Sequence, residues 1–177
     1  MKKLKNEELD RLTTAEFKAA KKTPIVLVLD NIRSMNNIGS AFRTSDAFRI
    51  DKIYLSGITA QPPHRDIQKT ALGATDTVSW QYVKDPVQCV LELKEQGYKV
   101  QAVEQAKNST RLQDFSPKIT SKLALVFGNE VKGVSDDVMQ VVDGCLEIPQ
   151  IGSKHSLNIS VSIGVVLWDI SNKLGVF

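Results

Sequence analysis

Short apolar runs alternate with helical patterns along most of this chain, and this alternation restricts the fold more than any other feature. The runs read PIVLVLD (24–30), KIYLSG (52–57), TVSWQYV (77–83), YKVQAVE (98–104), LALVFG (123–128) and GCLEIP (144–149). Their nearly continuous hydrophobicity predicts strands that are buried on both faces. The segments between and after them predict helices over residues 37–49, 64–72, 86–96, 135–141 and 157–172. Such alternation predicts one α/β domain, with a mainly parallel sheet and helices on both faces.

The chain has 177 residues, which is enough for one domain with a sizeable core. Its longest apolar stretch is interrupted by Ser and Asn, and it is shorter than the roughly 20 residues that cross a bilayer. The N-terminal segment contains lysines but no apolar core of a signal peptide. Cys89 and Cys145 lie far apart without zinc-site spacing, so we expect a reduced, cytoplasmic protein that needs no metal.

Positive charge is concentrated in the first half of the chain. Residues 1–22 and residues 31–70 each carry a net charge of +3, so the remainder carries −3. The first of these segments reads as an amphipathic helix, with Leu9, Leu12 and Phe17 on one side. A positive front half suits a polyanionic partner such as RNA, although ordinary helices with solvated lysines produce the same pattern.

Several common site motifs are missing. The segment LDNIRSMNNIGSAFR follows the first predicted strand but has one glycine, where a dinucleotide fingerprint needs three. Neither a phosphate-binding GxxxxGK[ST] loop nor a GxSxG nucleophile elbow occurs. Because ligands of open α/β sheets bind at the carboxyl ends of the strands, we inspect the loops after Asp30, Gly57, Phe127 and Ile148.

The first unusual loop is NNIGSAFRTSDAF. If Asn37 caps the helix, its side chain, the long side chain of Arg43 and the free N–H groups of the first turn converge on a site that favours anions. The spacing also allows a plain N-cap at Asn37 and a surface salt bridge at Arg43. Both interpretations stay open at this point.

The second unusual loop is LALVFGNEVKGVS, which follows a buried strand. Gly128 at the end of that strand would let the backbone approach a ligand closely, and Glu130 could anchor an arginine or sit beside a helix start. An ordinary glycine turn with a solvated glutamate accounts for the same residues.

The third unusual segment is IPQIGSKHSLNISVSIGVVLWDI (148–170). Ser156 is a suitable N-cap for the last helix, and Asn158 then occupies the first turn, where asparagine is unfavourable unless its amide is used. The helix carries two apolar rows: Leu157, Val161, Val165 and Trp168, and Ile159, Ile163, Val166 and Ile170. Two rows predict a helix that is buried nearly all round.

Together and in this order, these segments resemble the three motifs of the SpoU/TrmH family of RNA methyltransferases, in the SPOUT superfamily. NNIGSAFRTSDAF is similar to the first motif, LALVFGNEVKGVS to the second and LEIPQIGSKHSLNISVSIGVVLWDI to the third, and KTALGA (69–74) also fits. The resemblance implies a SPOUT-type α/β domain over residues 23–177, with a C-terminal trefoil knot. Residues 1–22 would form a basic helical extension.

The resemblance also implies methyl transfer from S-adenosyl-L-methionine to a ribose 2′-hydroxyl of rRNA or tRNA, by a homodimer whose site is completed across the interface. The catalytic residues it implies are Asn37, Arg43, Glu130, Ser156 and Asn158. The cofactor-binding residues it implies are Phe127, Gly128, Ile148, Gly152 and Leu157.

Family proposals make the arginine of the first motif the general base, but a guanidinium with a pKa above about 12 stays protonated. We therefore expect Arg43 to clamp a target phosphate through a bidentate, charge-assisted pair. Asn37 and Asn158 would orient the ribose and Arg43, Ser156 would bind substrate or Arg43, and Glu130 would position the assembly. Either the basic N-terminal helix together with the face formed by residues 31–70, or a partner, would recognise the RNA.

Two other functions remain compatible with the pattern. One is a catalytically inactive dimer of the same fold that binds structured RNA, which the presence of Asn37, Arg43 and Asn158 disfavours. The other is a small-molecule enzyme that uses Ser156 and His155, which the missing nucleophile elbow disfavours.

Overall fold

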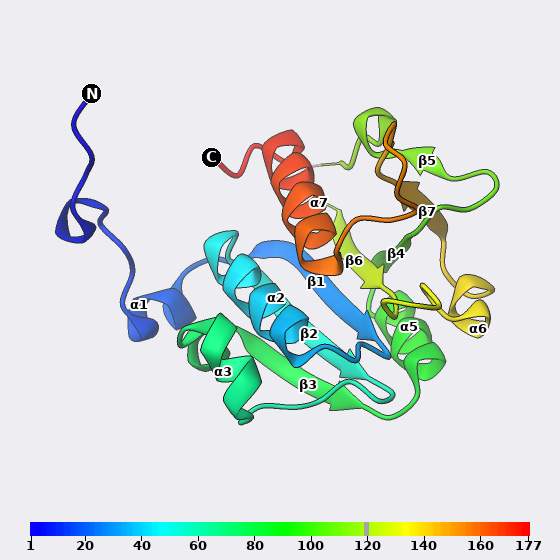
Figure 1. The fold of residues 1–177 in the computed structure, drawn as a ribbon, viewed down its shortest axis with the longest axis horizontal. Coiled ribbons are helices and arrows are strands. Elements are labelled where there is room, and N and C mark those ends of the chain that lie inside the picture. Colours follow the sequence, from blue (N-terminus) through cyan, green and yellow to red (C-terminus); the bar gives the residue numbers. More distant parts are fainter. Residues whose placement is uncertain (119–120) are drawn as a thin grey trace.

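The computed structural model describes residues 1–118 and 121–177. Over that part of the chain, seven strands form one sheet in the order β3-β2-β1-β6-β4-β7-β5, and every neighbouring pair is parallel. The strands are β1 (Thr23–Asp30), β2 (Ile50–Ser56), β3 (Ser79–Val83), β4 (Tyr98–Val103), β5 (Thr110–Arg111), β6 (Lys122–Phe127) and β7 (Gly144–Glu147). The predicted parallel α/β sheet is therefore confirmed, and β5 is an addition to the predicted strands (Figure 1).

Helices cover both faces of this sheet, as predicted. Ile25, Leu27 and Leu29 of β1 pack into one core, and Val26 and Val28 pack into the other, because successive side chains of a strand point to opposite faces. The first core includes α2 (Met35–Ala47), α3 (Arg65–Ala71), α4 (Ala74–Thr77) and α7 (Ile159–Lys173). The second includes α5 (Pro86–Glu95) and α6 (Asp136–Met139).

The strand register brings four strand ends to one edge of the sheet. Leu29 of β1 lies beside Phe127 of β6, Phe127 beside Val103 of β4, and Val103 beside Leu146 of β7. The loops that follow these strands therefore leave the sheet side by side. This edge is where ligands of open α/β sheets bind.

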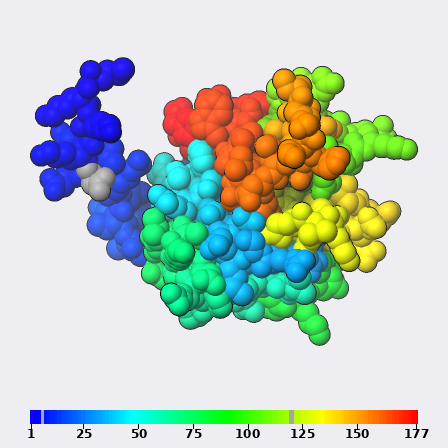
Figure 2. Space-filling view, in the orientation of Figure 1, coloured from blue at the N-terminus to red at the C-terminus, as the bar shows by residue number. Residues whose placement is uncertain are grey.

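The N-terminal segment is not the single helix that its pattern predicts. It contains a short 3₁₀ turn, η1 (Asn6–Glu8), and a separate helix, α1 (Thr14–Ala19), that begins at a capping box between Thr13 and Glu16. Phe17 is buried, whereas Leu12 is exposed, so the expected apolar face is not packed along its length. A short helix without such packing is marginal in water. Figure 2 shows the first residues, in dark blue, projecting from one side of the molecule.

Two helices have N-caps other than those predicted. Ser34 caps α2 by accepting a hydrogen bond from the Asn37 N–H at 3.3 Å, so Asn37 lies inside the first turn rather than at the cap. Asn158, and not Ser156, caps α7, because its Oδ1 accepts from the Ser160 N–H at 2.9 Å. Asn158, which the sequence pattern placed unfavourably inside the first turn, is thus the capping residue.

The last helix is buried on one side only. Its row Ile159, Ile163, Val166 and Ile170 belongs to the core, but Leu157, Val161, Val165 and Trp168 are 39%, 51%, 39% and 57% exposed. The predicted burial nearly all round is therefore wrong for the single chain. Within the described residues, no helix combines the length and the apolar character that crossing a membrane requires.

Candidate active site

A cleft of ≈ 850 Å³ opens at the edge where the four strand ends meet. It is bordered by the end of β4, by the loop between β6 and α6 (residues 128–135, the β6–α6 loop), and by the loop between β7 and α7 (residues 148–158, the β7–α7 loop). The cleft therefore unites segments that lie far apart in the sequence. Two of the three segments singled out from the sequence contribute its walls.

The β6–α6 loop is folded tightly on itself. The backbone N–H groups of Asn129 and Gly133 each donate to the carbonyl of the other, at 2.9 and 2.8 Å. The Asn129 Oδ1 accepts from the N–H groups of Val131 and Lys132. A Cβ on Gly128 would lie 2.0 Å from the Gly133 and Val134 backbone, so this turn can close only over a glycine.

The same loop is fixed to the end of β1 by buried polar groups. Asp30 is fully buried, and its Oδ2 accepts from the Ser135 N–H at 2.8 Å while its Oδ1 accepts from the Asn31 side chain at 2.7 Å. The Asn129 Nδ2 donates to the Asn31 carbonyl at 2.7 Å. Because buried polar groups are stable only when they are paired, these bonds determine where the loop lies.

Glu130 projects from this loop toward the start of α2. Its Oε2 accepts from the Arg33 N–H and its Oε1 from the Ser34 N–H and the Asn37 Nδ2, each at 3.0 Å. Burial acts to raise the pKa of Glu130, but hydrogen bonds from Arg33, Asn37 and Ser34 outweigh it, so the pKa lies below its ordinary value. The carboxylate is therefore ionised at neutral pH and holds the first turn of α2.

Asn37 continues this chain of contacts to the third segment. The Asn158 Nδ2 donates to the Asn37 Oδ1 at 3.3 Å, while the Asn158 Oδ1 caps α7. Glu130, Asn37 and Asn158 thus form one hydrogen-bonded row, with one residue from each of the three segments. The structure brings together three of the five residues expected to be catalytic.

The other two residues, Ser156 and Arg43, do not join that row. Ser156 lines the cleft and is exposed. Arg43 is exposed on α2, six residues beyond Asn37, and within the described residues it takes part in no hydrogen bond or salt bridge. Its guanidinium is thus available to a ligand of opposite charge.

Four of the five residues expected to bind the cofactor line the cleft, and one does not. Phe127, Gly128, Ile148 and Leu157 all line the cleft. Gly152 lies in the β7–α7 loop but outside the lining, and a Cβ placed on it would meet nothing within 4 Å. Across the described ranges, no three His, Cys, Asp or Glu residues form a group that could hold a metal ion.

Sequence reasoning missed the contribution of β4. Glu104 and Gln105, which follow this strand, line the cleft. The Glu104 carboxylate accepts from the Val134 N–H at 3.2 Å, and the Gln105 Nε2 donates to the His155 carbonyl at 2.6 Å. These two residues therefore contact both loops that form the walls of the cleft, the β6–α6 loop and the β7–α7 loop. The signal was present, since YKVQAVE ends in an acidic residue at the ligand-binding edge of the sheet.

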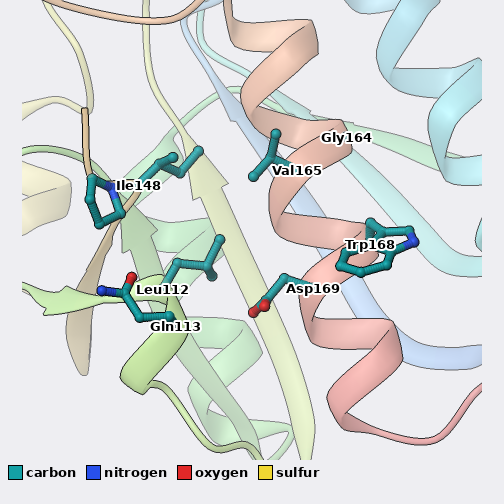
Figure 3. Close-up of a pocket in the computed structure, with 8 residues that line it drawn as sticks. Leu112, Gln113, Ile148, Gly164, Val165, Trp168 and Asp169 are labelled. Atoms are coloured by element: carbon teal, nitrogen blue, oxygen red, sulfur yellow. The ribbon is translucent and has the colours of Figure 1, made fainter. Parts of the chain in front are cut away.

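A second hollow of ≈ 480 Å³ lies on the exposed side of α7. Figure 3 shows Val165 and Trp168 projecting from this helix, with Ile148 and Leu112 on the opposite side of the hollow. Its lining is mainly apolar, and it shares Ile148 with the cleft. The hollow therefore belongs to the exposed apolar face of α7 rather than to the polar row.

The chain belongs to the SpoU rRNA Methylase family, whose model matches residues 24–168. That span contains the first two segments, the third as far as Trp168, and every residue that lines the cleft. The predicted family resemblance is therefore confirmed.

Two relatives illustrate the range of RNA within the family. A tRNA (guanosine(18)-2′-O)-methyltransferase of Aquifex aeolicus is 30% identical over 82% of this chain and 67% of its own length. A 23S rRNA (guanosine-2′-O-)-methyltransferase RlmB of Vibrio parahaemolyticus is 30% identical over 95% of this chain and 65% of its own length. The chain thus spans about two thirds of the length of these relatives.

Solved structures agree on the fold. The TrmH/SpoU tRNA modifying enzyme of A. aeolicus superimposes with a TM-score of 0.78 at 27% identity, over 89% of this chain and 78% of that one. The SpoU methyltransferase AviRb of Streptomyces viridochromogenes, solved in complex with the cofactor AdoMet, gives 0.77 at 20% identity, over 90% and 64%. The SPOUT-type α/β architecture is confirmed, while the trefoil knot stays a prediction.

Proposed function

We propose that this protein transfers a methyl group from S-adenosyl-L-methionine to a ribose 2′-hydroxyl of rRNA or tRNA. The observation that carries the proposal is the row Glu130, Asn37 and Asn158, which joins all three segments at the border of the cleft. Family membership and relatives that are named as guanosine 2′-O-methyltransferases support it.

The cleft suits a nucleoside donor in size and chemistry. Its volume of ≈ 850 Å³ falls within the range of about 300–1,000 Å³ that is usual for small-molecule sites. Phe127, Ile148 and Leu157 offer apolar surface, while Glu104 and Gln105 offer polar groups at the same opening. Bound there, the sulfonium of the donor would supply an electrophilic methyl group.

The chain's own residues would place the RNA against that donor. Arg43 would hold a phosphate next to the target nucleotide, because its free guanidinium can pair with two phosphate oxygens. Asn37 would orient the ribose, with its own position set by Glu130 and Asn158. Ser156, exposed at the rim of the cleft, would bind the substrate. Rate enhancement would then come largely from correct placement of the two reactants.

Two measurements test this function. Calorimetry should detect binding of S-adenosylhomocysteine, and the protein should methylate unmodified bulk RNA at ribose 2′-oxygens. Arg43→Ala should lower kcat/KM for RNA by about 10²-fold, as loss of a charge-assisted clamp of about 3 kcal/mol predicts, while donor affinity stays the same. Arg111→Ala, a change of an exposed arginine in β5 outside residues 1–22 and 31–70, serves as the control.

The outcomes separate the competing functions. Donor binding with no effect of Arg43→Ala would refute the phosphate clamp. Failure of both donor and product to bind would favour an inactive RNA-binding dimer of the same fold. Esterase activity that Ser156→Ala abolishes would instead favour the small-molecule enzyme.

We further propose that the protein acts as a homodimer through the exposed face of α7. Leu157, Val161, Val165 and Trp168 form an apolar row that no described part of the single chain covers, and the hollow in Figure 3 lies beside this row. Leu157 also lines the cleft, so a second copy on this face would border the active site. Light scattering should give the dimer mass, and Val161→Glu together with Trp168→Glu should give the monomer mass.

The RNA target would be rRNA or tRNA in the cytoplasm, read by the basic segment of residues 1–22 or by the face formed by residues 31–70. The domain of residues 23–177 would carry out the reaction. Mass-spectrometric mapping of ribose methylations that disappear when the gene is deleted would identify the nucleotide. If every ribose methylation persists after the gene is deleted, the proposed activity is wrong.

A further inference from the structure

The β7–α7 loop forms one wall of the cleft but has very few attachments. Residues 149–158 are all exposed, and of these Gln150, His155, Ser156, Leu157 and Asn158 line the cleft. Within the described residues, a single hydrogen bond links residues 149–157 to the rest of the chain. The Gln105 Nε2 donates it to the His155 carbonyl, over 2.6 Å.

Gln105 itself stands on a rigid base. The residue before it, Glu104, donates its N–H to the Leu146 carbonyl at 3.0 Å, and its carbonyl accepts a hydrogen bond from the Cys145 thiol. The Glu104 Oε1 also accepts from the Gln105 N–H at 2.8 Å. The side chain of Gln105 therefore extends from a backbone that β7 holds in place.

The same short segment also holds the opposite wall. The Glu104 Oε2 accepts from the Val134 N–H in the β6–α6 loop. Two consecutive residues after β4 thus reach to the two walls of the cleft, and they fix the distance between them.

From this arrangement we infer that Gln105 is a positioning residue for the methyl donor. Its hydrogen bond holds residues 149–157 across the cleft, so that the backbone around His155 and the side chains of Ser156 and Leu157 face the donor. The inference rests on the proposed function because it takes the ligand to be S-adenosyl-L-methionine. The hydrogen bond from Gln105 to His155, which we call the tether, is present in the chain without any ligand.

The experiment compares Gln105→Glu and Gln105→Met with the unmodified protein. Glutamate keeps the shape of the side chain and removes the N–H donor, while methionine removes the donor without adding charge. Trypsin cleaves after Lys154, which is exposed in the loop, and the rate of appearance of the peptide ending at Lys154 reports how often the loop opens. Both variants should raise this rate, and the Kd for S-adenosylhomocysteine, by about 2- to 13-fold, the range that one hydrogen bond gives.

Gln88→Glu is the matched control. Gln88 lies on α5, outside the cleft lining, and its Nε2 donates a hydrogen bond of 3.1 Å to the Glu92 Oε1. The substitution removes one side-chain donor and adds one charge, as at position 105, and it should change neither rate nor Kd. The midpoint of thermal unfolding should fall by no more than about 6 °C in the two Gln105 variants, as the loss of one hydrogen bond predicts, and a larger fall would indicate a merely structural role.

Three results would overturn the inference. They are cleavage after Lys154 at the unmodified rate in both variants, faster cleavage with an unchanged Kd, and an effect of glutamate without an effect of methionine. If the unmodified protein binds no S-adenosylhomocysteine, the proposed function fails. Cleavage after Lys154 in the ligand-free chain still measures the tether in that case.

Discussion

The two loops that border the cleft are built in opposite ways. The β6–α6 loop closes on itself through Asn129 and Gly133, and it is bonded to Asp30, Asn31 and Glu104. The β7–α7 loop is exposed and is tied to the body by Gln105 until Asn158 starts α7. Among the described residues, the first wall is thus held by many polar contacts, whereas residues 149–157 of the second are held by one.

This difference agrees with different tasks for the two walls. Glu130 must hold the start of α2 in one geometry, and preorganised groups need supporting bonds that leave them little freedom. The opposite wall must admit a ligand and then enclose it, and segments that open locally have few buried contacts. We therefore expect substitutions of similar size to have large effects in the first loop and small effects in the second.

The largest effect is expected for Gly128→Ala. The added Cβ would lie 2.0 Å from the backbone of Gly133 and Val134, and backbone atoms cannot move aside as the end of a side chain can. We expect a loss of about 3 kcal/mol in the free energy of unfolding, measured by urea denaturation. A loss below about 0.5 kcal/mol would show that the first loop is as adaptable as the second.

Asp30→Ala should have the next largest effect. It leaves the Ser135 N–H without its acceptor, and Asp30 is fully buried. An unpaired buried donor costs about 1–3 kcal/mol, so we expect a loss of about 2 kcal/mol and faster hydrogen exchange at Ser135. Ser56→Ala removes a buried hydroxyl beside Asp30 in the sheet that donates to the Leu29 carbonyl but not to the β6–α6 loop, and it should leave exchange at Ser135 unaffected.

Glu130→Gln should cost less, about 1 kcal/mol at pH 7, because the carboxylate is still exposed to solvent. Its pKa in the folded chain is below the ordinary 4.5, so its contribution is complete above about pH 4.5 and is lost as the pH falls through the lower folded value. The difference between Glu130→Gln and the unmodified protein should therefore shrink in acid. A difference that grows in acid would contradict the hydrogen bonds to Arg33, Ser34 and Asn37.

Gly152→Ala should have the smallest effect. A Cβ there meets nothing within 4 Å, and Gly152 is exposed, so the free energy of unfolding should change by less than about 0.5 kcal/mol. Gly128→Ala and Gly152→Ala are the same substitution in the two walls, so the difference between their effects measures the difference between the two loops. A loss comparable with that at Gly128 would remove the proposed distinction between the loops.

The sequence predicted well those features that depend on local periodicity. The strands around Val28, Leu55 and Leu125 follow from continuous apolar runs, and the parallel sheet follows from their alternation with helices. Helix starts were less accurate. Asn37 and Ser156 are chemically suitable caps, yet Ser34 and Asn158 have that role, because several capping residues stand close together and the surrounding contacts select among them.

The site was partly predictable for the same reason. Glu130, Asn37 and Asn158 stand in segments with unusual local composition, which led to their selection before any contact was known. Glu104 and Gln105 were not selected, because their significance lies in reaching Val134 and His155, residues 30 and 50 positions away. The acidic end of YKVQAVE marks Glu104 as a candidate, but no local pattern shows which distant residues Glu104 and Gln105 contact.

By itself the sequence determined the class of fold, the order of its elements and the residue types at the carboxyl ends of the strands, since these follow from periodicity, turn chemistry and the direction of parallel strands. Only the tertiary structure decided which of those residues meet, how firmly each wall of the cleft is held, and which face of α7 is left uncovered. The physical reason is range: hydrophobic pattern acts over a few neighbouring residues, whereas the polar bonds that shape this cleft join positions up to 121 residues apart.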